Sequence, residues 1–145
     1  MTAEITYHPD WADNFLIVTA HHSTAVPIRI GEAKGDILND GTGFLGDVCV
    51  KEEFETRGWF LGIGKRKIRV REMGVGSKLL EIFESEMLNH GVSQIKGNLM
   101  PETPEKLDRL IQWYQKRDYD FIPDETTGNW APPGTCGVVS KVIRK

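Results

Sequence analysis

The chain has 145 residues, of which 39% are hydrophobic and 27% are charged, and its formal net charge is -3. This size suits one domain with a full core, and the negative charge argues against a general nucleic-acid binder. No apolar stretch approaches the roughly 18 residues that a membrane helix needs, and the first residues lack the pattern of a signal peptide. Cys49 and Cys136 lie far apart in the sequence, which suits a reduced protein, so we expect residues 1–145 to form one cytoplasmic domain.

The N-terminal half is predicted to form strands separated by turns. Phe15–Ala20 is a short apolar run typical of a buried strand, and Val26–Ile30, continuing to about Lys34, predicts another. Asn39–Gly43 is rich in turn-forming residues. Phe44–Phe54 alternates apolar and polar side chains, which predicts a central strand.

The next segment is a predicted hairpin whose apolar pattern changes phase. Thr56–Gly58 should close a hairpin onto Trp59–Ile63. Apolar residues occupy odd positions within Trp59–Ile63 but even positions at Ile68 and Val70. Because a strand repeats every two residues, we expect a β-bulge or short turn at Gly64–Lys67. Such a bulge frees backbone polar groups that a ligand can use.

A glycine-containing loop follows at a predicted strand-to-helix junction. The loop reads Arg71-Glu72-Met73-Gly74-Val75-Gly76-Ser77, and an amphipathic helix is expected from Ser77 to His90, ended by Gly91. Glycine lets backbone N–H groups approach a ligand closely, and the helix end adds unpaired N–H groups and a positive dipole end. The pattern predicts a phosphate or pyrophosphate site. One face of the helix should be buried, through Leu79, Leu80, Phe83 and Met87, while Glu81, Glu84 and Glu86 should point mostly elsewhere.

The C-terminal half alternates strands with a second helix. Val92–Leu99 predicts a strand, and its place after a strand and a helix favours a right-handed parallel crossover. Thr103 followed by proline is typical of a helix start, and this helix should end near Arg117. The last predicted strands are Tyr119–Ile122 and Val138–Ile143, joined by a long loop over residues 126–137.

This order of elements and two motifs resemble the GNAT superfamily of N-acetyltransferases. The first motif, the family's acetyl-CoA loop, is Arg/Gln-x-x-Gly-x-Gly/Ala, which Arg71–Gly76 matches. The second motif is aromatic-Tyr-x-Lys-x-Gly-Phe, and Trp113–Tyr119 matches it with Asp118 and Tyr119 in place of the glycine and phenylalanine. The resemblance covers about residues 43–121. The family also commonly places acceptor-binding helices near the N-terminus, where this chain has no clear helical pattern.

The resemblance implies a fold and a ligand. The fold is α/β (α+β): a mixed, mostly antiparallel central sheet with a parallel split at a bulged strand, flanked by helices. Acetyl-CoA is implied as co-substrate, with no metal. The residues implied to bind it are Leu61, Gly62 and Ile63 of the bulged strand, Arg71, Glu72, Met73, Gly74, Val75, Gly76 and Ser77 of the loop, and Tyr114. A backbone N–H of the bulged strand would stabilise the oxyanion.

Tyr114 is the candidate catalytic acid. The family often has a tyrosine at this position, and a phenol can donate a proton to the departing CoA thiolate. The alternative is that Tyr114 packs in an apolar stripe with Leu107, Leu110 and Ile111 of the second predicted helix. One amphipathic ring can satisfy both interpretations.

The candidate bases for the acceptor amine are three carboxylates. Asp47, Glu52 and Glu53 lie on the predicted central strand and could act directly or through water. Taken singly, each also fits a simple surface carboxylate. Cys49 on the same strand fits a nucleophile, but a lone strand cysteine is more often a small core residue.

The implied function is direct acetyl transfer from acetyl-CoA to the primary amine of a small molecule or peptide. Two alternatives stay open: a non-catalytic CoA-binding or protein-interaction module with the same fold, and another fold that binds a different phosphate ligand. A dinucleotide-binding loop is a weaker match because its third glycine and downstream acid are not apparent, and a Walker loop requires a Gly-Lys-Ser/Thr that is absent. We expect no nucleic-acid or membrane partner, and a homodimer is left open.

Overall fold

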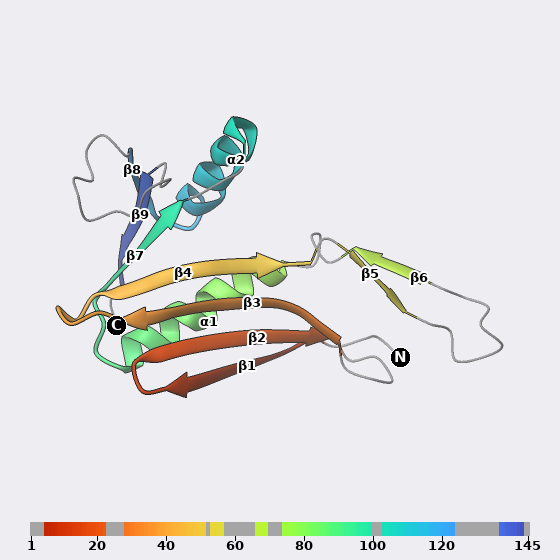
Figure 1. Cartoon of the computed structure of the whole chain (residues 1–145), viewed down its shortest axis with the longest axis horizontal. Coiled ribbons are helices and arrows are strands. Elements are labelled where there is room, and N and C mark those ends of the chain that lie inside the picture. Colours follow the sequence, from red (N-terminus) through yellow and green to blue (C-terminus); the bar gives the residue numbers. More distant parts are fainter. Residues whose placement is uncertain are drawn as a thin grey trace. The chain divides into compact units, whose positions relative to one another are not determined.

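The structure is a computed structural model that describes residues 5–22, 28–51, 53–56, 66–69, 74–99, 103–123 and 137–143. Its elements, drawn in Figure 1, are β1 (Ile5–Ala12), β2 (Phe15–His22), β3 (Ile28–Ile37), β4 (Gly43–Val50), β5 (Glu53–Thr56), β6 (Arg66–Arg69), α1 (Val75–Asn89), β7 (Gln94–Leu99), α2 (Pro104–Gln115), β8 (Asp120–Pro123) and β9 (Gly137–Val142). Neither described helix is long and apolar enough to cross a bilayer.

The strands form one large mixed sheet and one small sheet. Seven strands pair in the order β1-β2-β3-β4-β7-β9-β8, and β5 pairs with β6 alone in the second sheet. β4 and β7 run parallel, with Gly43–Leu45 opposite Ile95–Gly97. The pairs β1–β2, β7–β9 and β8–β9 are antiparallel. The predicted mixed, mostly antiparallel sheet with one parallel pair and flanking helices is therefore confirmed.

Contacts divide the chain into two compact units. The first unit comprises Met1–Lys34 and Asp47–Phe83, and the second comprises Gly35–Gly46 and Glu84–Lys145. The division falls within β3, β4 and α1, so each unit contains part of these elements.

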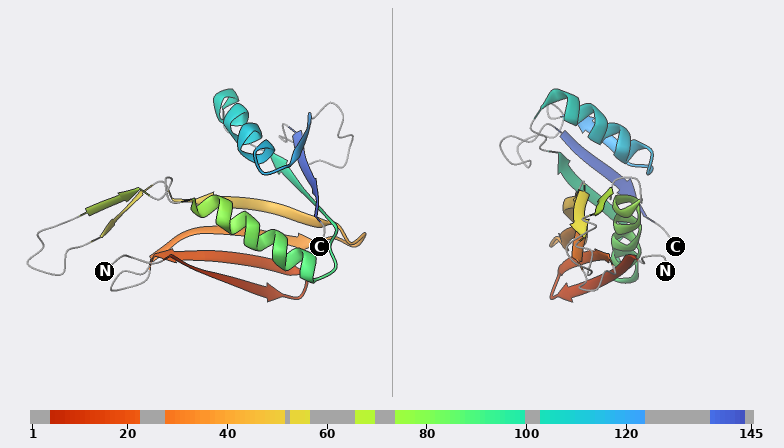
Figure 2. Two further views of the ribbon diagram at one scale, coloured as in Figure 1. Left: turned by 180° about the vertical axis from the view of Figure 1, so that it is seen from behind. Right: turned by 90° about the vertical axis from the view of Figure 1, so that its right-hand side faces the viewer.

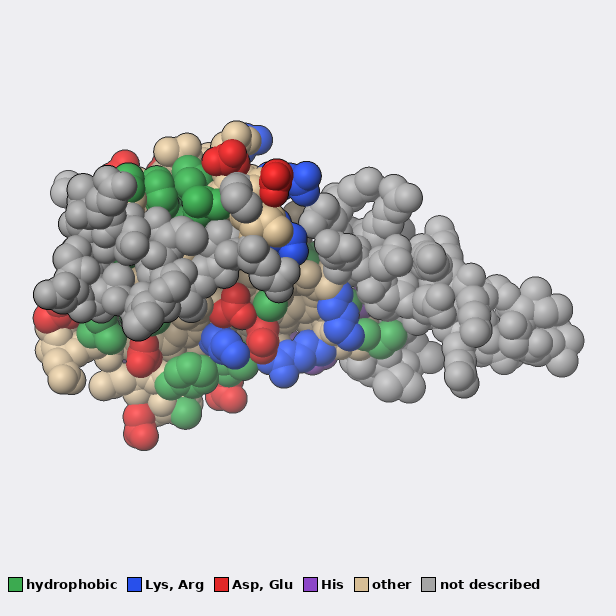
Figure 3. Space-filling model, turned by 45° about the horizontal axis from the view of Figure 1, so that its top comes forward, with side chains coloured by type: hydrophobic (Ala, Val, Ile, Leu, Met, Phe, Trp, Pro, Cys, Tyr) green, Lys and Arg blue, Asp and Glu red, His purple; other side chains and the backbone are tan. Residues whose placement is uncertain are grey.

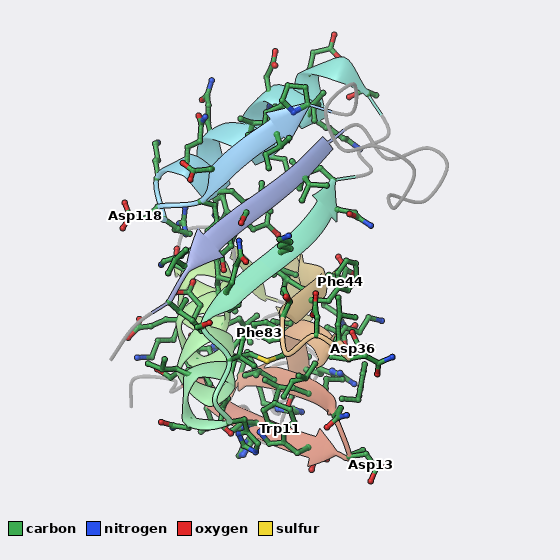
Figure 4. All side chains as sticks on the ribbon, turned by 90° about the vertical axis from the view of Figure 1, so that its left-hand side faces the viewer. Trp11, Asp13, Asp36, Phe44, Phe83 and Asp118 are labelled. Carbon is green, nitrogen blue, oxygen red and sulfur yellow. The ribbon has the colours of Figure 1, made fainter. Side chains whose placement is uncertain are left out.

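In the first unit, β1 and β2 form a hairpin that the sequence pattern did not predict in full. The two strands pair from Ile5 opposite His22 to Ala12 opposite Phe15. Asp13 takes a left-handed backbone at the turn, with φ 53°, and Figure 4 shows it at the tip of this hairpin. Because the turn joins the strands so directly, no helix lies between them.

The core of the first unit lies between α1 and the strands. Leu16, Val18 and Ala20 of β2 have no exposed surface, and neither does Phe83 of α1. Figure 2 shows α1 running along one face of the strands, and Figure 4 shows Phe83 pointing from the helix toward them. A Cβ at Gly31 of β3 would lie only 3.0 Å from Leu79 Cδ1, so the helix and strand approach too closely for a side chain. The predicted buried face of this helix is confirmed.

In the second unit, α1 ends at a glycine, as predicted. Gly91 has φ 87°, its N–H donates to the Leu88 carbonyl (3.0 Å), and the Val92 N–H donates to the Met87 carbonyl (3.0 Å). This is a Schellman motif, in which a left-handed residue lets the last carbonyls of a helix find partners. Met87 and Val92, which flank the motif, are both buried.

α2 has a predicted start and an unusual end. The Thr103 hydroxyl accepts a hydrogen bond from the Lys106 N–H (3.2 Å), which caps the helix. At the other end, Asp118 has φ 68°, and the Tyr119 N–H donates to the Tyr114 carbonyl (3.1 Å). This second Schellman motif therefore carries an aspartate where glycine is usual, and Figure 4 shows Asp118 at this turn.

Two predictions about the segment ahead of the glycine loop are wrong. The expected single strand Phe44–Phe54 is divided into β4 and β5, which belong to different sheets. The expected tight hairpin at Thr56–Gly58 is replaced by a wider one, because Thr56 of β5 pairs with Arg66 of β6. Phe54 opposes Ile68 in the backbone register of that pairing.

The parallel crossover also starts from a different strand than expected. The sequence suggested Trp59–Val70 as its first strand, but β4 pairs with β7, and the β5–β6 hairpin intervenes between β4 and α1. Gly43 and Leu45 of β4 are buried there. The predicted strand Trp59–Ile63 lies outside the described residues, as do Gly64 and Lys65 of the predicted bulge, whereas Arg66 and Lys67 belong to β6.

The two helix ends predict opposite effects of matched substitutions. Asp118→Gly should raise the free energy of unfolding by about 0.5–1 kcal/mol, because glycine adopts a left-handed backbone without a Cβ clash. Gly91→Ala should lower the free energy of unfolding by about 1 kcal/mol, because alanine is strained in a left-handed backbone. No atom lies within 4 Å of the added Cβ, so this loss comes from the backbone alone. Urea denaturation followed by circular dichroism measures both changes. A destabilised Asp118→Gly variant would show that the aspartate side chain stabilises the turn.

Candidate functional site

The described part of the predicted phosphate loop is its junction with α1. Gly74 is exposed and has φ 68°, and α1 begins at the next residue. The first hydrogen bond of the helix runs from the Lys78 N–H to the Gly74 carbonyl (3.1 Å). N–H groups that precede this bond lie at the open end of the helix, where a bound anion accepts hydrogen bonds from them. Arg71, Glu72 and Met73 lie outside the described residues.

The charge and anchoring of this helix start both suit an anion. Among the described residues at this helix start, the first turn of α1 contains no acidic side chain that would offset the positive end of the helix dipole. Val75 is 1% exposed and would contact a Cβ at Gly31 at 3.3 Å. The buried valine therefore ties the start of the helix to β3. Gly76 and Ser77 follow it in the first turn and are half-buried.

The three candidate bases do not share one strand, contrary to the prediction. Asp47 is exposed in β4, whereas Glu53 opens β5 in the small sheet, where it opposes Arg69. Their separation follows from the break between β4 and β5. Glu52 and the predicted oxyanion strand Leu61, Gly62 and Ile63 lie outside the described residues. Asp47 is thus the candidate base that the structure places on the large sheet.

An open groove at the neighbouring ends of β3 and β4 was not expected from the sequence. The strands are joined there by a hydrogen bond from the Lys51 N–H to the Ile30 carbonyl (2.8 Å). The side chains of Arg29 and Glu32 line the groove and form an ion pair with each other. The sequence sign of such a groove is the presence of charged residues within the otherwise apolar strand β3. This pattern does not distinguish a groove from a strand face exposed to solvent.

Cys49 also lines this groove, and the interpretation of it as a core residue is wrong. The thiol is exposed, so Cys49 is not a core residue. Partial burial, followed by the charge of Asp47 and a hydrogen bond to it, raises the pKa of the Cys49 thiol. A raised pKa reduces the thiolate that nucleophilic attack requires. The environment of Cys49 therefore disfavours a covalent intermediate.

Tyr114 is buried near the end of α2 in the second unit. Tyr114 is 6% exposed, while the other members of the same stripe are only half-buried: Leu107, Leu110 and Ile111. Its ring meets Trp113 edge-on with centroids 4.9 Å apart and Tyr119 with centroids 5.3 Å apart. The packing interpretation of Tyr114 is thus observed, and an acid role remains compatible with it.

A polar cluster beside Tyr114 was not foreseen. The Tyr119 hydroxyl donates to Glu84 Oε2 (3.2 Å), and Lys141 Nζ donates to Glu84 Oε1 (2.7 Å). Glu84 was expected to point mostly away from the core, yet its side chain is only 17% exposed. No sequence signal pairs these residues, because they come from segments far apart in the chain. Within the ranges that the structure describes, no group of three or more His, Cys, Asp or Glu side chains could hold a metal ion.

Comparisons with known proteins find relatives by structure but not by sequence. No family model and no curated protein sequence matches the chain. A GNAT-family acetyltransferase from Staphylococcus aureus has a TM-score of 0.63 and 12% identity, covering 90% of this chain and 68% of its own. Ard1 from Thermoplasma volcanium has a TM-score of 0.58 and 16% identity, covering 93% and 74%.

A third similar structure was solved with a ligand. The PaiA N-acetyltransferase from Thermoplasma acidophilum, in complex with coenzyme A, has a TM-score of 0.55 and 12% identity, covering 90% of this chain and 62% of its own. These identities are too low to transfer an activity, but the structural agreement extends over most of the chain. The chain has the fold of the GNAT acetyltransferases.

Proposed function

We propose that this protein is an N-acetyltransferase that moves the acetyl group of acetyl-CoA directly to a primary amine. The observation that carries the proposal is the junction at Gly74, where a left-handed glycine opens a helix with no acidic residue in its first turn. The GNAT fold supports the same ligand, and the similar PaiA structure contains coenzyme A. Residues 1–145 would act as a single acyl-CoA-binding domain in the cytoplasm.

The donor would be held mainly by backbone groups. N–H groups of the Arg71–Ser77 loop and the first turn of α1 would donate to the pyrophosphate of CoA. Leu61, Gly62 and Ile63 are proposed to contact the rest of the donor, as the family resemblance implies. No metal is needed in this scheme, because backbone N–H groups and the helix dipole supply the positive potential.

The transfer would proceed by attack of a neutral amine on the thioester carbonyl. The C–N bond forms first, the negative charge collects on the carbonyl oxygen, and the C–S bond then breaks. The amine proton would pass to a base, for which Asp47 is the described candidate and Glu52 and Glu53 are the others. The Tyr114 hydroxyl would give its proton to the departing sulfur. Positioning of the two substrates would contribute much of the rate.

A non-catalytic CoA-binding module is the second candidate. The observation that favours it is the burial of Tyr114, since only 6% of that residue is exposed. The same fold would then bind CoA and report its presence to a partner. Ligand binding does not separate the two candidates, whereas release of free thiol in the presence of amines does.

The acceptor is proposed to be an amine of a small molecule or peptide rather than a nucleic acid. On the face drawn in Figure 3, the described basic and acidic side chains are interspersed instead of forming a broad basic surface. Such a surface would be expected for phosphate-backbone binding. A homodimer is compatible with the proposal and is not required by it.

Glycine substitutions in the loop should abolish CoA binding. Gly74→Val forces a branched side chain into a left-handed backbone and places it where the pyrophosphate approaches. We expect the affinity for CoA to fall at least about tenfold in isothermal titration calorimetry, with the fold retained. Gly76→Val should act in the same direction.

The matched control for this test is Gly41→Val in the turn between β3 and β4. Gly41 has φ 85° and, like Gly74, no atom within 4 Å of an added Cβ. The two variants should therefore lose similar stability, but only Gly74→Val should lose CoA. Equal affinities for CoA in the two variants would contradict the assignment of the loop.

Removing the Tyr114 hydroxyl should slow transfer without preventing donor binding. In Tyr114→Phe we expect kcat to fall by about tenfold to a hundredfold, because the thiolate leaves without a proton donor. The assay follows free thiol release over a panel of amines and a range of pH. Full activity of Tyr114→Phe at every pH would exclude the acid role.

Cys49 should be dispensable for the reaction. Since the pKa of its thiol is raised, a covalent acetyl-cysteine intermediate is disfavoured, and Cys49→Ser should keep kcat within about twofold of the wild type. The same thiol-release assay measures this. Loss of activity in Cys49→Ser, together with an acetylated cysteine in the mass spectrum of the wild type, would indicate transfer through the thiol.

A further inference from the structure

We propose that Glu84, Tyr119 and Lys141 form a positioning network that holds the Tyr114 ring in place for its role as the acid. The inference rests on the proposed function and extends it to residues that do not touch the substrates. All four residues belong to the second unit.

The first link joins Tyr114 to Tyr119. The Schellman motif at the end of α2 connects them through the backbone, with the Tyr119 N–H donating to the Tyr114 carbonyl at 3.1 Å. Their rings also meet, with centroids 5.3 Å apart and an angle of 68° between the planes. An edge-to-face pair of this kind restricts both rings. A displacement of Tyr119 should therefore also displace the ring of Tyr114.

The second link holds Tyr119 to another element. Tyr119 is 2% exposed, and its hydroxyl donates a hydrogen bond to Glu84 Oε2 of α1 at 3.2 Å. Burial, reinforced by the charge of Glu84, strongly raises the pKa of the Tyr119 hydroxyl, so it stays a donor throughout the physiological range. The segment after α2 is thus connected to α1 by a partly buried hydrogen bond.

The third link makes the buried carboxylate tolerable. Lys141 of β9 donates to Glu84 Oε1 at 2.7 Å, with side chains that are 22% and 17% exposed. Lys141 Nζ also lies 5.5 Å from the centroid of the Tyr119 ring, within cation–π range. A half-buried carboxylate without this partner would lose its charge compensation. The ring of Tyr119, which follows α2, is thereby held by contacts to α1 and β9.

Packing alone does not explain the hydroxyl group of Tyr119. In the motif that the chain resembles, this position is a phenylalanine, which would fill the same aromatic space without burying a polar group. Burying a hydroxyl is unfavourable unless it is hydrogen-bonded, and here Glu84 accepts that bond. The bond therefore adds orientation to the contact between Tyr119 and Tyr114. We infer that this orientation is used in catalysis.

The test is a double-mutant cycle between Tyr119→Phe and Tyr114→Phe. Tyr119→Phe should lower kcat by about fivefold to tenfold in the wild-type background, measured well below the Tm of the variant, while leaving the KM for acetyl-CoA nearly unchanged. In the Tyr114→Phe background, Tyr119→Phe should have no further effect on kcat, because the group that it positions is already gone. Glu84→Ala should reproduce Tyr119→Phe, whereas Glu84→Gln, which can still accept the hydrogen bond, should recover part of kcat. Glu81→Ala, which breaks an exposed Lys78–Glu81 pair on α1, serves as the control and should not change kcat.

The outcomes separate failure of this inference from failure of the proposed function. Equal loss of kcat from Tyr119→Phe in both backgrounds, or a lowered Tm with unchanged kcat, would show that the network only stabilises the fold. A wild-type protein that binds CoA but releases no thiol with any amine would overturn the proposed function, and the positioning role with it.

Discussion

The packing of α1 against the strands is the constraint on which the rest of the structure depends. Leu79 and Phe83 are fully buried, and the absence of a side chain at Gly31 lets the helix approach β3 closely. The buried Val75 places the start of the helix directly after the left-handed Gly74. An anion site built in this way is preorganised, because its donors are backbone groups of a packed element.

Local patterns predicted the parts of the fold that depend on a few neighbouring residues. The helical period of α1, the Thr103 cap and the glycine that follows α1 each have a signal within one or two turns, and the structure confirms them. Strand pairing depends on residues far apart in the chain, which local patterns do not reveal. The sequence therefore suggested Trp59–Val70 as the first strand of the parallel crossover, whereas β4 is the strand that pairs with β7. β1 was missed because the polar run at its centre interrupts the alternation that marks a strand.

The same distinction applies to the candidate site. The helix start at Gly74 could be predicted from the glycines around it, whereas the inward position of Glu84 depends on Tyr119 and Lys141, which no local pattern links to it. Two further features distinguish this chain from what the resemblance implied. The β5–β6 hairpin intervenes before the loop, and β1 and β2 join without a helix between them.

In the proposed function, the loop and the start of α1 recognise the pyrophosphate of CoA. The most direct measurement compares the affinities of CoA and pantetheine, which share the thiol arm but differ in the pyrophosphate and nucleotide, by isothermal titration calorimetry. We expect saturable binding of CoA that weakens as salt is raised, with pantetheine bound at least about a hundredfold more weakly. Equal affinity for the two compounds, or no binding of CoA at millimolar concentration, would contradict it.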